Sequence, residues 1–190
     1  NAIVWWGIRE KSSEPWADGA PHPVGQGASV FGDGATCLHH AESATRFAPA
    51  EVWENRNPWL INRVELIQDS GGAGKYRGGL GVNFEFTMLE DSYATTVCER
   101  TKFPPWGLNG GKEGLTNNCF LLDENEKSVE IPKATRVHVT KGKRILLQCG
   151  GGGGYGDPND RSHEKVLDDY KQGYISKDYI KNFHPEVKLN

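Results

Sequence analysis

Apolar and polar side chains alternate along the middle of the chain. The clearest case runs from Val82 to Met88, where Phe84 and Phe86 also occupy every second position and mostly polar residues stand between them. Such alternation predicts a half-buried strand of about eight residues. Other segments of the same kind lie at 60–68, 94–99, 119–122, 128–131, 135–139 and 144–149. Short strands at this spacing are typical of a β-sandwich or a barrel.

Three segments have the apolar spacing of short helices, at 49–55, 163–172 and 177–183. Asp160 or Ser162 can cap the start of the second segment, because both side chains accept hydrogen bonds from the first free N–H groups of a helix. The last two segments follow each other closely near the C-terminus. They therefore predict a pair of helices appended to the β-rich part.

These patterns predict a mainly β fold: a multi-stranded sandwich or barrel-like body, a short C-terminal helical appendage and an irregular Gly/Pro-rich N-terminal segment. The expected divisions are 1–59 for the irregular segment, 60–150 for the β-rich body, and 151–190 for a glycine loop with the C-terminal helices. The apolar stretch at 3–6 is an awkward free end for a domain. We therefore expect the N-terminal segment to continue from a preceding part of the polypeptide.

Composition argues against several classes of protein. The net charge is −3 and the isoelectric point is about 6.1, so the chain lacks the basic surface of a nucleic-acid-binding protein. No apolar stretch approaches the ~20 residues that a membrane span needs, and no secretory signal is visible. The hydrophobic fraction of 36% suffices for a core. We expect a cytoplasmic protein that binds neither nucleic acid nor membrane.

The four cysteines are irregularly spaced and form no C-x-x-C motif, so a zinc ribbon has no support. Cys98, Cys119 and Cys149 lie in apolar, strand-like segments, where a free cysteine behaves as a small hydrophobic residue. Buried, reduced thiols are the favoured interpretation. Two disulfides, or a catalytic or metal-binding cysteine, remain alternatives.

Glycine accounts for 24 of the 190 residues, well above the usual share of about 7%, and it is clustered. The loop at 69–79 resembles a phosphate-binding P-loop only superficially, because Asp69 and Tyr76 stand where that motif needs Gly and Ser or Thr. The loop also leads into a strand, whereas a P-loop leads into a helix. A tight structural loop is favoured, with a contribution to an active site or subunit interface as the alternative.

A run of five glycines spans 150–154. Ordering five glycines costs much backbone entropy, which would suit a flexible linker. The run nevertheless lies between an apolar strand that ends at Cys149 and a turn at 155–158. This position favours ordered backbone in close contact with another segment or a ligand, with the linker as the alternative.

Few side chains suggest catalysis. His39 and His40, together with Glu42, can supply metal ligands, but adjacent residues point in different directions, so at most one histidine would serve directly. Trp16 and Trp106 lie in Pro/Gly loops, where an indole ring closes a core edge, an interface or a pocket wall. Four aspartates beside Gly, Pro or Ser are typical of turns, and any of them is an alternative general base: Asp18, Asp33, Asp69 and Asp157.

The order of the glycine motifs resembles one family. The sequence D-S-G-G-A-G-K-Y-R-G-G-L-G occupies 69–81, Glu99-Arg100 follows, P-W-G-L-x-G-G begins at 105, and G-G-G-G-G-Y-G-D-P occupies 150–158. This succession closely resembles the C-terminal part of the hydantoinase B family, which includes the oxoprolinase B-type halves and the large subunits of acetone and acetophenone carboxylases. A-D-G at 17–19 and E-x-x-E-x-x-x-P at 51–58 look like upstream members of the same pattern.

The resemblance implies a part of the B-type subunit of an ATP-dependent enzyme complex. In this family a hydantoinase A-type subunit binds ATP, the oxygen of a cyclic amide or an enolised ketone is phosphorylated, and the B-type subunit carries out hydrolysis or carboxylation. The expected complex is a hetero-oligomer with the A-type subunit and the N-terminal part of the B-type subunit. It uses ATP with Mg²⁺ and a divalent Zn or Mn ion held elsewhere, so no cofactor or metal is expected on this chain.

The resemblance leaves the catalytic residues unassigned. The candidates for a substrate pocket or an interface are Asp18, His39, His40, Trp106 and Tyr155. The glycines expected to shape structural loops are Gly71, Gly72, Gly74, Gly78, Gly79, Gly110, Gly111, Gly151, Gly152, Gly153, Gly154 and Gly156. Region 20–48 differs from the hydantoinase-like pattern, which slightly favours a ketone carboxylase or another divergent member over a true hydantoinase. The alternative function is a non-catalytic structural subunit that scaffolds such a complex.

Overall fold

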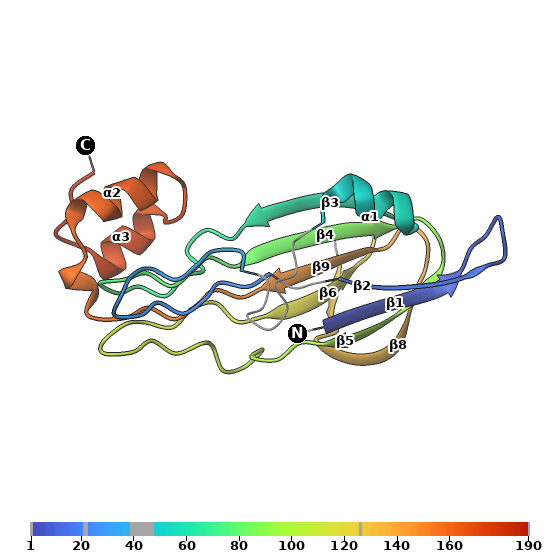
Figure 1. Cartoon of the computed structure of the whole chain (residues 1–190), viewed down its shortest axis with the longest axis horizontal. Helices are drawn as coiled ribbons and strands as arrows, with labels where there is room; N and C mark the ends of the chain where they lie inside the picture. Colours follow the sequence, from blue (N-terminus) through green and yellow to red (C-terminus); the bar gives the residue numbers. More distant parts are fainter. Residues whose placement is uncertain (1, 21–22, 39–47, 126, 190) are drawn as a thin grey trace.

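Two antiparallel sheets face each other in the computed structural model, which describes residues 2–20, 23–38, 48–125 and 127–189 (Figure 1). The first sheet has the strand order β2-β1-β5-β8. The second has the order β3-β4-β9-β6-β7. The bounds are β1 Ala2–Ile8, β2 Pro15–Ala20, β3 Trp59–Leu66, β4 Val82–Met88, β5 Ser92–Val97, β6 Asn118–Leu122, β7 Ser128–Glu130, β8 Lys133–Val139 and β9 Arg144–Cys149.

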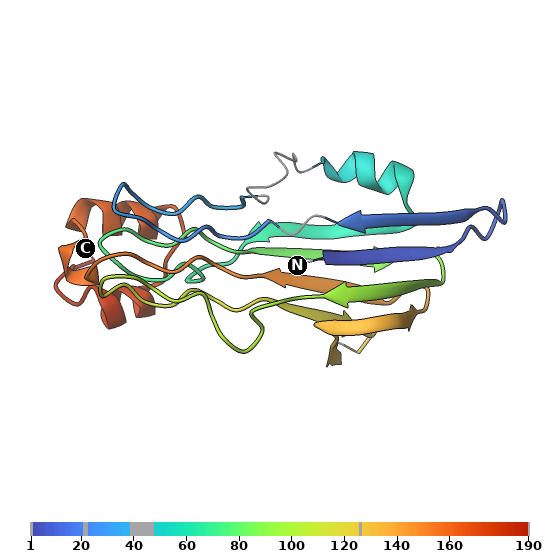
Figure 2. The same ribbon diagram turned by 60° about the horizontal axis from the view of Figure 1, so that its bottom comes forward.

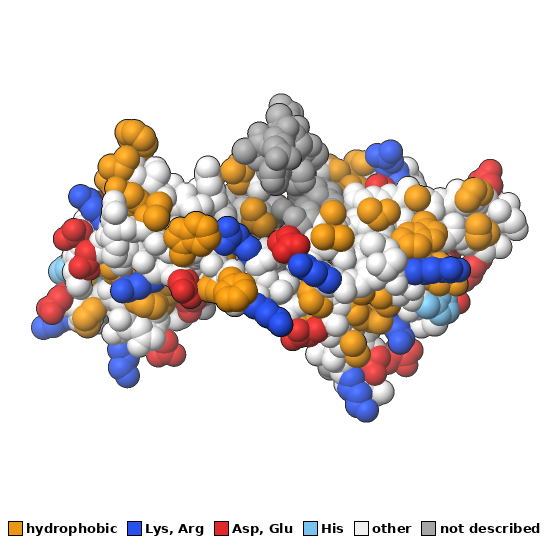
Figure 3. All heavy atoms as spheres, turned by 90° about the horizontal axis from the view of Figure 1, so that it is seen from below, with side chains coloured by type: hydrophobic (Ala, Val, Ile, Leu, Met, Phe, Trp, Pro, Cys, Tyr) orange, Lys and Arg blue, Asp and Glu red, His pale blue; other side chains and the backbone are white. Residues whose placement is uncertain are grey.

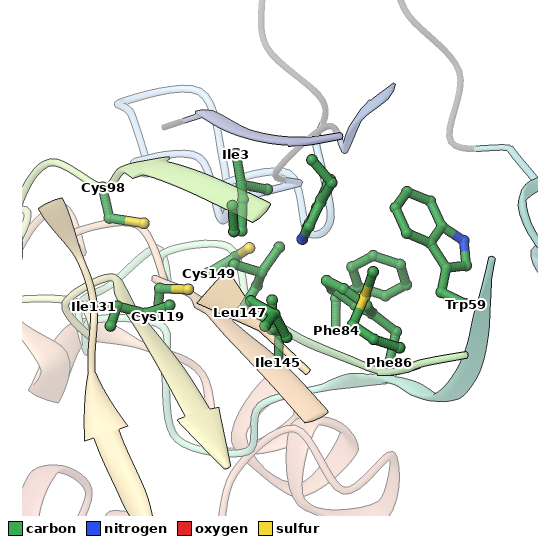
Figure 4. Packing of buried hydrophobic residues seen from close by; sticks show 14 of the residues in the cluster. Ile3, Trp59, Phe84, Phe86, Cys98, Cys119, Ile131, Ile145, Leu147 and Cys149 are labelled. Carbon is green, nitrogen blue, oxygen red and sulfur yellow. The ribbon is translucent and has the colours of Figure 1, made fainter. Parts of the chain in front are cut away.

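The hydrophobic core lies between the two sheets (Figure 4). The Trp5 side chain of β1 is fully buried, and its ring centroid lies 5.0 Å from that of Trp59 and 4.9 Å from that of Phe86. Both contacts are edge-to-face, an arrangement that adds about 0.5–1.5 kcal/mol to simple burial. The buried alternate residues of β4 and β9 complete the core, as their sequence alternation predicts.

The predicted mainly β fold is confirmed, and each predicted strand lies within a few residues of an observed one. One expectation is corrected, because β1 and β2 lie inside the segment 1–59 that was expected to be irregular. Pro15 made this part resemble a loop. It opens β2, an edge strand of the sheet, where the missing N–H of proline breaks no ladder.

Three α-helices are observed where they were predicted: α1 (Ala50–Arg56), α2 (His163–Lys171) and α3 (Lys177–Phe183). A 3₁₀ turn, η1 (Pro158–Asp160), precedes α2. Ser162 caps α2, since its hydroxyl accepts a hydrogen bond from the Lys165 N–H, and Ser176 caps α3 in the same way. Figure 1 shows α2 and α3 at one end of the molecule, opposite the β1–β2 hairpin.

A buried charge network ties the C-terminal helices to the loops of residues 33 and 77. The Arg161 guanidinium forms two hydrogen bonds to Asp33 (2.7 and 2.9 Å) and one to Asp169 of α2 (2.8 Å). Arg77 also donates to Asp169, at 3.2 Å. Burial by itself would raise the pKa of Asp33, but the hydrogen bonds and positive charge of Arg161 outweigh it and lower that pKa. The network therefore anchors α2 through paired charges.

On the surface, Figure 3 shows charged side chains of both signs interspersed with hydrophobic ones over the face in view. This mixture agrees with the small net charge of −3. In the described parts of the chain, no helix has the length and apolar character to cross a bilayer.

Candidate functional site: a glycine bundle and its cleft

Extended segments without regular secondary structure connect the sandwich to the C-terminal helices, and they run side by side in both ribbon views (Figures 1 and 2). The five glycines at 150–154 continue directly from β9 and are all buried. Their neighbours include segments 24–28, 70–74, 78–81 and 105–115. We call this arrangement the glycine bundle.

Backbone hydrogen bonds join the glycine run to several neighbours. The Gly152 N–H donates to the Gly79 carbonyl at 2.9 Å, and the Gly154 N–H donates to the Lys112 carbonyl at 2.9 Å. In the other direction, the Gly150 carbonyl accepts from the Gly25 N–H at 2.9 Å. The run therefore lies inside the bundle and pairs with segments that are distant in sequence.

Successive glycines of the run meet different neighbours. A Cβ atom on Gly151 would lie 1.9 Å from the Ser70 carbonyl oxygen, one on Gly152 would lie 1.9 Å from that of Gln26, and one on Gly153 would lie 2.0 Å from that of Trp106. At Gly154 the neighbour is again segment 70–74, with the Ala73 oxygen at 2.1 Å. The Cβ positions of Gly151 and Gly154 thus face the same segment, three residues apart. A repeat of three residues is the periodicity of a polyproline II helix. No side chain fits on any side, so the run is closely packed backbone and not a flexible linker.

The loop at 69–79 is packed in the same manner. Cβ atoms on Gly71 and Gly78 would lie 2.2 and 1.9 Å from the carbonyl oxygens of Gly78 and Gly152. The loop leads into β4, and Asp69 accepts a hydrogen bond from the Ser176 N–H at 2.6 Å. These contacts are structural, in line with the tight loop favoured from the sequence.

A cleft of about 310 Å³ opens beside the glycine run, and we call it the glycine cleft. Its lining residues are Val24, Gly25, Gly27, Arg100, Pro105, Trp106, Asn117, Gly150, Gly151, Gly152 and Gly153. A volume of this size is at the lower end of the range for small-ligand sites, roughly 300–1,000 Å³.

Arg100 and Trp106 form one wall of the glycine cleft. The Arg100 guanidinium carbon lies 4.7 Å from the centroid of the Trp106 ring, a cation–π contact. Trp106 is 62% exposed. Arg100 has a φ of +54°, a left-handed conformation that costs a non-glycine residue about 1 kcal/mol or more. Strained residues of this kind cluster at functional sites.

The buried Asn117 side chain holds this wall against the glycine run. Its Nδ2 donates to the Glu99 carbonyl at 2.8 Å, and its Oδ1 accepts from the Gly150 N–H at 2.6 Å. Its backbone N–H donates to the Arg100 carbonyl at 3.2 Å. Asn117 thus joins the turn at 99–100 to the first glycine of the run.

The structure describes three of the five predicted pocket or interface residues, and the three lie at different positions. Trp106 lines the glycine cleft. Asp18 lies on β2, where it accepts hydrogen bonds from Asn57 Nδ2 at 2.8 Å and from the Gly19 N–H at 2.7 Å. The Tyr155 hydroxyl accepts from Asn109 Nδ2 at 2.7 Å. The glycine cleft does not include Asp18 or Tyr155, so these residues form no common pocket there. His39 and His40 lie outside the described residues.

Arg100 belongs to a family motif in the sequence, but the sequence predicted no role for it. The sequence predicted no role for Asn117 either. The Glu99-Arg100 dipeptide was the available signal for Arg100. No local pattern marks Asn117, because its partners at Glu99 and Gly150 lie 18 and 33 residues away in sequence.

The cysteines are all free, and Cys98, Cys119 and Cys149 are buried in the core whereas Cys37 is exposed. Burial raises the pKa of Cys149 to about 12. The Cys119 thiol donates a hydrogen bond to Cys98, and this bond together with burial raises the pKa of Cys119. Such thiols stay protonated at neutral pH and are poor nucleophiles. Within the ranges that the structure describes, no cluster of three or more His, Cys, Asp or Glu side chains is placed to hold a metal ion.

The glycine motifs that identify the family by their order are therefore the segments that build the bundle. Residues 1–158 match the family model described as hydantoinase B/oxoprolinase. The chain belongs to this family. The resemblance drawn from the motif order is confirmed, and it covers both sheets and the glycine bundle.

Individual members of the hydantoinase B/oxoprolinase family extend the match. The chain is 36% identical over 135 residues to the caprolactamase subunit beta of Pseudomonas jessenii, covering 67% of this chain and 23% of that subunit. The crystal structure of the ATP-dependent caprolactamase from Pseudomonas jessenii matches 99% of this chain and 34% of its own, with a TM-score of 0.85 and 26% identity. A nucleotide-free acetone carboxylase structure matches 96% of this chain and 29% of its own, with a TM-score of 0.80 and 20% identity, which shows a shared fold.

The chain spans between 9% and 25% of the length of the curated relatives that it matches. The activity of a whole family member is therefore carried by much more polypeptide than these 190 residues.

Proposed function

We propose that this chain is part of the B-type subunit of an ATP-dependent enzyme complex that hydrolyses a cyclic amide. The observation that carries the proposal is the similarity to the ATP-dependent caprolactamase, which extends over 99% of the chain at 26% identity. Caprolactam is a cyclic amide, and the sequence match to a caprolactamase subunit supports the same substrate class. A ketone substrate, slightly favoured by region 20–48, rests on a likeness of 20% identity that extends only to the fold.

The caprolactamase relative is named as a subunit beta, which supports a hetero-oligomer. In our proposal an A-type partner binds ATP and Mg²⁺, and a divalent metal is held by the N-terminal part of the B-type subunit. This chain contributes the wall that contains Trp106, together with contacts near Asp18 and Tyr155. Four free cysteines support a reducing, cytoplasmic location.

The test is to purify the native complex that contains this chain and to measure ATP hydrolysis with hydantoins, lactams and ketones, the ketones with bicarbonate. We expect ATP hydrolysis to depend on a cyclic amide and on a co-purified ATP-binding subunit. If only ketones with bicarbonate stimulate ATP hydrolysis, the reaction is a carboxylation of a ketone and not the hydrolysis of a cyclic amide. Absence of substrate-dependent ATP hydrolysis from an intact complex would refute the proposal.

The alternative, a scaffold without a part in the reaction, is tested in the same complex with Trp106→Ala. A scaffold predicts that the complex keeps its mass and its kcat/KM. A pocket wall predicts an intact complex with a lower kcat/KM. Val129→Ala is the matched control, because Val129 is exposed to a similar extent, 61% against 62%, and belongs to the edge strand β7.

A further inference from the structure

We infer that the glycine cleft binds the oxyanion group, a carboxylate or a phosphoryl group, of a small organic ligand. The inference concerns binding by this chain alone. It therefore holds whichever subunit of a complex carries the chemistry, and it is independent of the proposed function.

The charge of the glycine cleft is the first argument. Among the lining residues that the structure describes, Arg100 is the only charged one, and none of them carries a carboxylate. Arg100 also makes no ion pair with a carboxylate of the described residues, and its guanidinium instead lies over Trp106. The arginines that do pair with carboxylates are Arg63, Arg77, Arg144 and Arg161. An unpaired guanidinium at the edge of an uncharged cavity attracts an anion.

Unpaired backbone donors are the second argument. The N–H groups of Gly150, Gly152 and Gly154 donate to Asn117, Gly79 and Lys112. For the N–H groups of Gly151 and Gly153, no acceptor is found among the described residues, although both glycines are buried and line the cleft. Buried N–H groups are almost always paired with protein, water or ligand. Both N–H groups belong to residues that line the cleft, and an acceptor-only group such as an oxyanion would suit them.

The rigidity of the glycine cleft is the third argument. Asn117 holds the backbone of Arg100, and the Arg100 guanidinium lies over the Trp106 ring, so part of the ordering of this side chain precedes binding. A planar guanidinium also matches the two oxygens of a carboxylate or phosphate. Val24, Pro105 and the Trp106 ring supply apolar surface for the organic part of the ligand. The ligand is therefore a small organic anion.

The experiment is a ¹H–¹⁵N NMR titration of the full chain with acetate and with inorganic phosphate, at ionic strength kept constant with sodium chloride. We expect saturable shifts of the Gly151 and Gly153 amides and of Arg100 Nε, with a Kd in the millimolar range for such minimal probes. The probe with the lower Kd shows whether the group is a carboxylate or a phosphoryl group. Sodium chloride alone is expected to leave these signals in place.

Arg100→Gln is expected to raise the Kd about tenfold or more, because it removes a charge-assisted hydrogen bond. Arg136→Gln is the matched control and is expected to leave the Kd unchanged. Arg136 has the same φ of +54° and lies 5.3 Å from the Tyr93 ring centroid, but it belongs to β8 and not to the cleft. Arg100→Lys, which keeps the charge but not the planar group, is expected to bind with intermediate affinity.

Three results would overturn the inference. One is the absence of saturable shifts at Gly151 and Gly153 with either probe. Another is an equal response to chloride, which would indicate screening and not a site. The third is an equal loss of affinity in Arg100→Gln and Arg136→Gln, with both variants shown to be folded by their remaining glycine amide signals.

Discussion

Gly152 illustrates, at the scale of a single residue, how little space the glycine bundle leaves for a side chain. A Cβ atom there would lie 1.9 Å from the Gln26 carbonyl oxygen and 2.2 Å from its carbonyl carbon. Both are backbone atoms, so the clash cannot be relieved by turning a side chain. We expect Gly152→Ala to lower the free energy of unfolding by about 3 kcal/mol. Chemical denaturation with urea measures this loss.

Gly32→Ala is the control for that variant. No atom lies within 4 Å of the position where its Cβ would stand. The change should alter the free energy of unfolding by less than about 0.5 kcal/mol, and it slightly favours folding because alanine restricts the unfolded chain. Equal losses in the two variants would contradict the close packing of the run 150–154.

His184 adds a pH dependence at the same scale. Burial of its ring lowers the pKa of His184 below 6.5, and the positive charge of Arg161 adds to this effect. The unfolded chain therefore takes up a proton near pH 6.5, whereas the folded chain takes it up only at lower pH. The free energy of unfolding contributed by this group is complete above pH 6.5 and falls as the pH decreases below it.

The measurement is the urea stability of the wild type and of His184→Gln between about pH 7 and pH 5. We expect the wild type to lose stability toward pH 5 with a steeper slope than the variant. Asp33 acts in a different window, because its lowered pKa makes its contribution decline only below its ordinary value of 3.8. Parallel slopes for the two proteins would exclude His184 as the cause.

At the scale of elements, α2 depends on its buried charges. Asp169 accepts hydrogen bonds from both Arg161 and Arg77, and its side chain is 9% exposed. Asp169→Asn leaves two buried guanidinium groups with an incomplete partner, so we expect a loss of about 3 kcal/mol in the free energy of unfolding. Asp168→Asn is the matched control on the same helix. Its side chain is 63% exposed, it lies 3.9 Å from Lys171, and its loss should stay below about 0.5 kcal/mol.

Elements with a local signal were predictable from the sequence. The alternation over β4 and the helical spacing with Ser162 at α2 both act within a few residues, and both gave nearly correct bounds. The glycine bundle has no such signal, because each glycine meets a segment that is distant in sequence. The sequence predicted only that the run 150–154 is in close contact with another segment or a ligand, and it did not show which segment.

The glycine cleft was less predictable than the fold. Trp106 was a candidate because an aromatic residue in a Pro/Gly loop closes a core edge, an interface or a pocket wall, three alternatives that the sequence does not separate. The role of Asn117 depends on the geometry of two other segments, so no spacing in the sequence reveals it. Asp18 was expected near a pocket or interface, and the structure adds its contact with Asn57, 39 residues away in sequence, which no local pattern reveals.

At the scale of the whole molecule, two segments of the glycine bundle are direct continuations of strands in the second sheet. Segment 78–81 leads directly into β4, and β9 leads directly into the run 150–154. The C-terminal helices join the same structure through Arg161 and through the Tyr179 hydroxyl, which donates to the Gly71 carbonyl at 2.9 Å. Because β4 and β9 lie in the centre of the second sheet, we expect that unfolding of the bundle also disrupts this sheet. We therefore expect the described structure to unfold as one cooperative unit.

This cooperativity is tested by heating wild type and Gly152→Ala while two probes are followed. Tryptophan fluorescence reports mainly on the sandwich core, because the buried Trp5, Trp53 and Trp59 belong to it whereas Trp106 is exposed, and NMR signals of the glycine amides report on the bundle. A loss of about 3 kcal/mol in a chain of this size lowers the transition midpoint by roughly 6–12 °C. We expect both probes to shift by this amount together, although the substitution lies outside the sandwich. A fluorescence midpoint that stays at the wild-type temperature while the glycine signals melt earlier would show that the bundle unfolds separately.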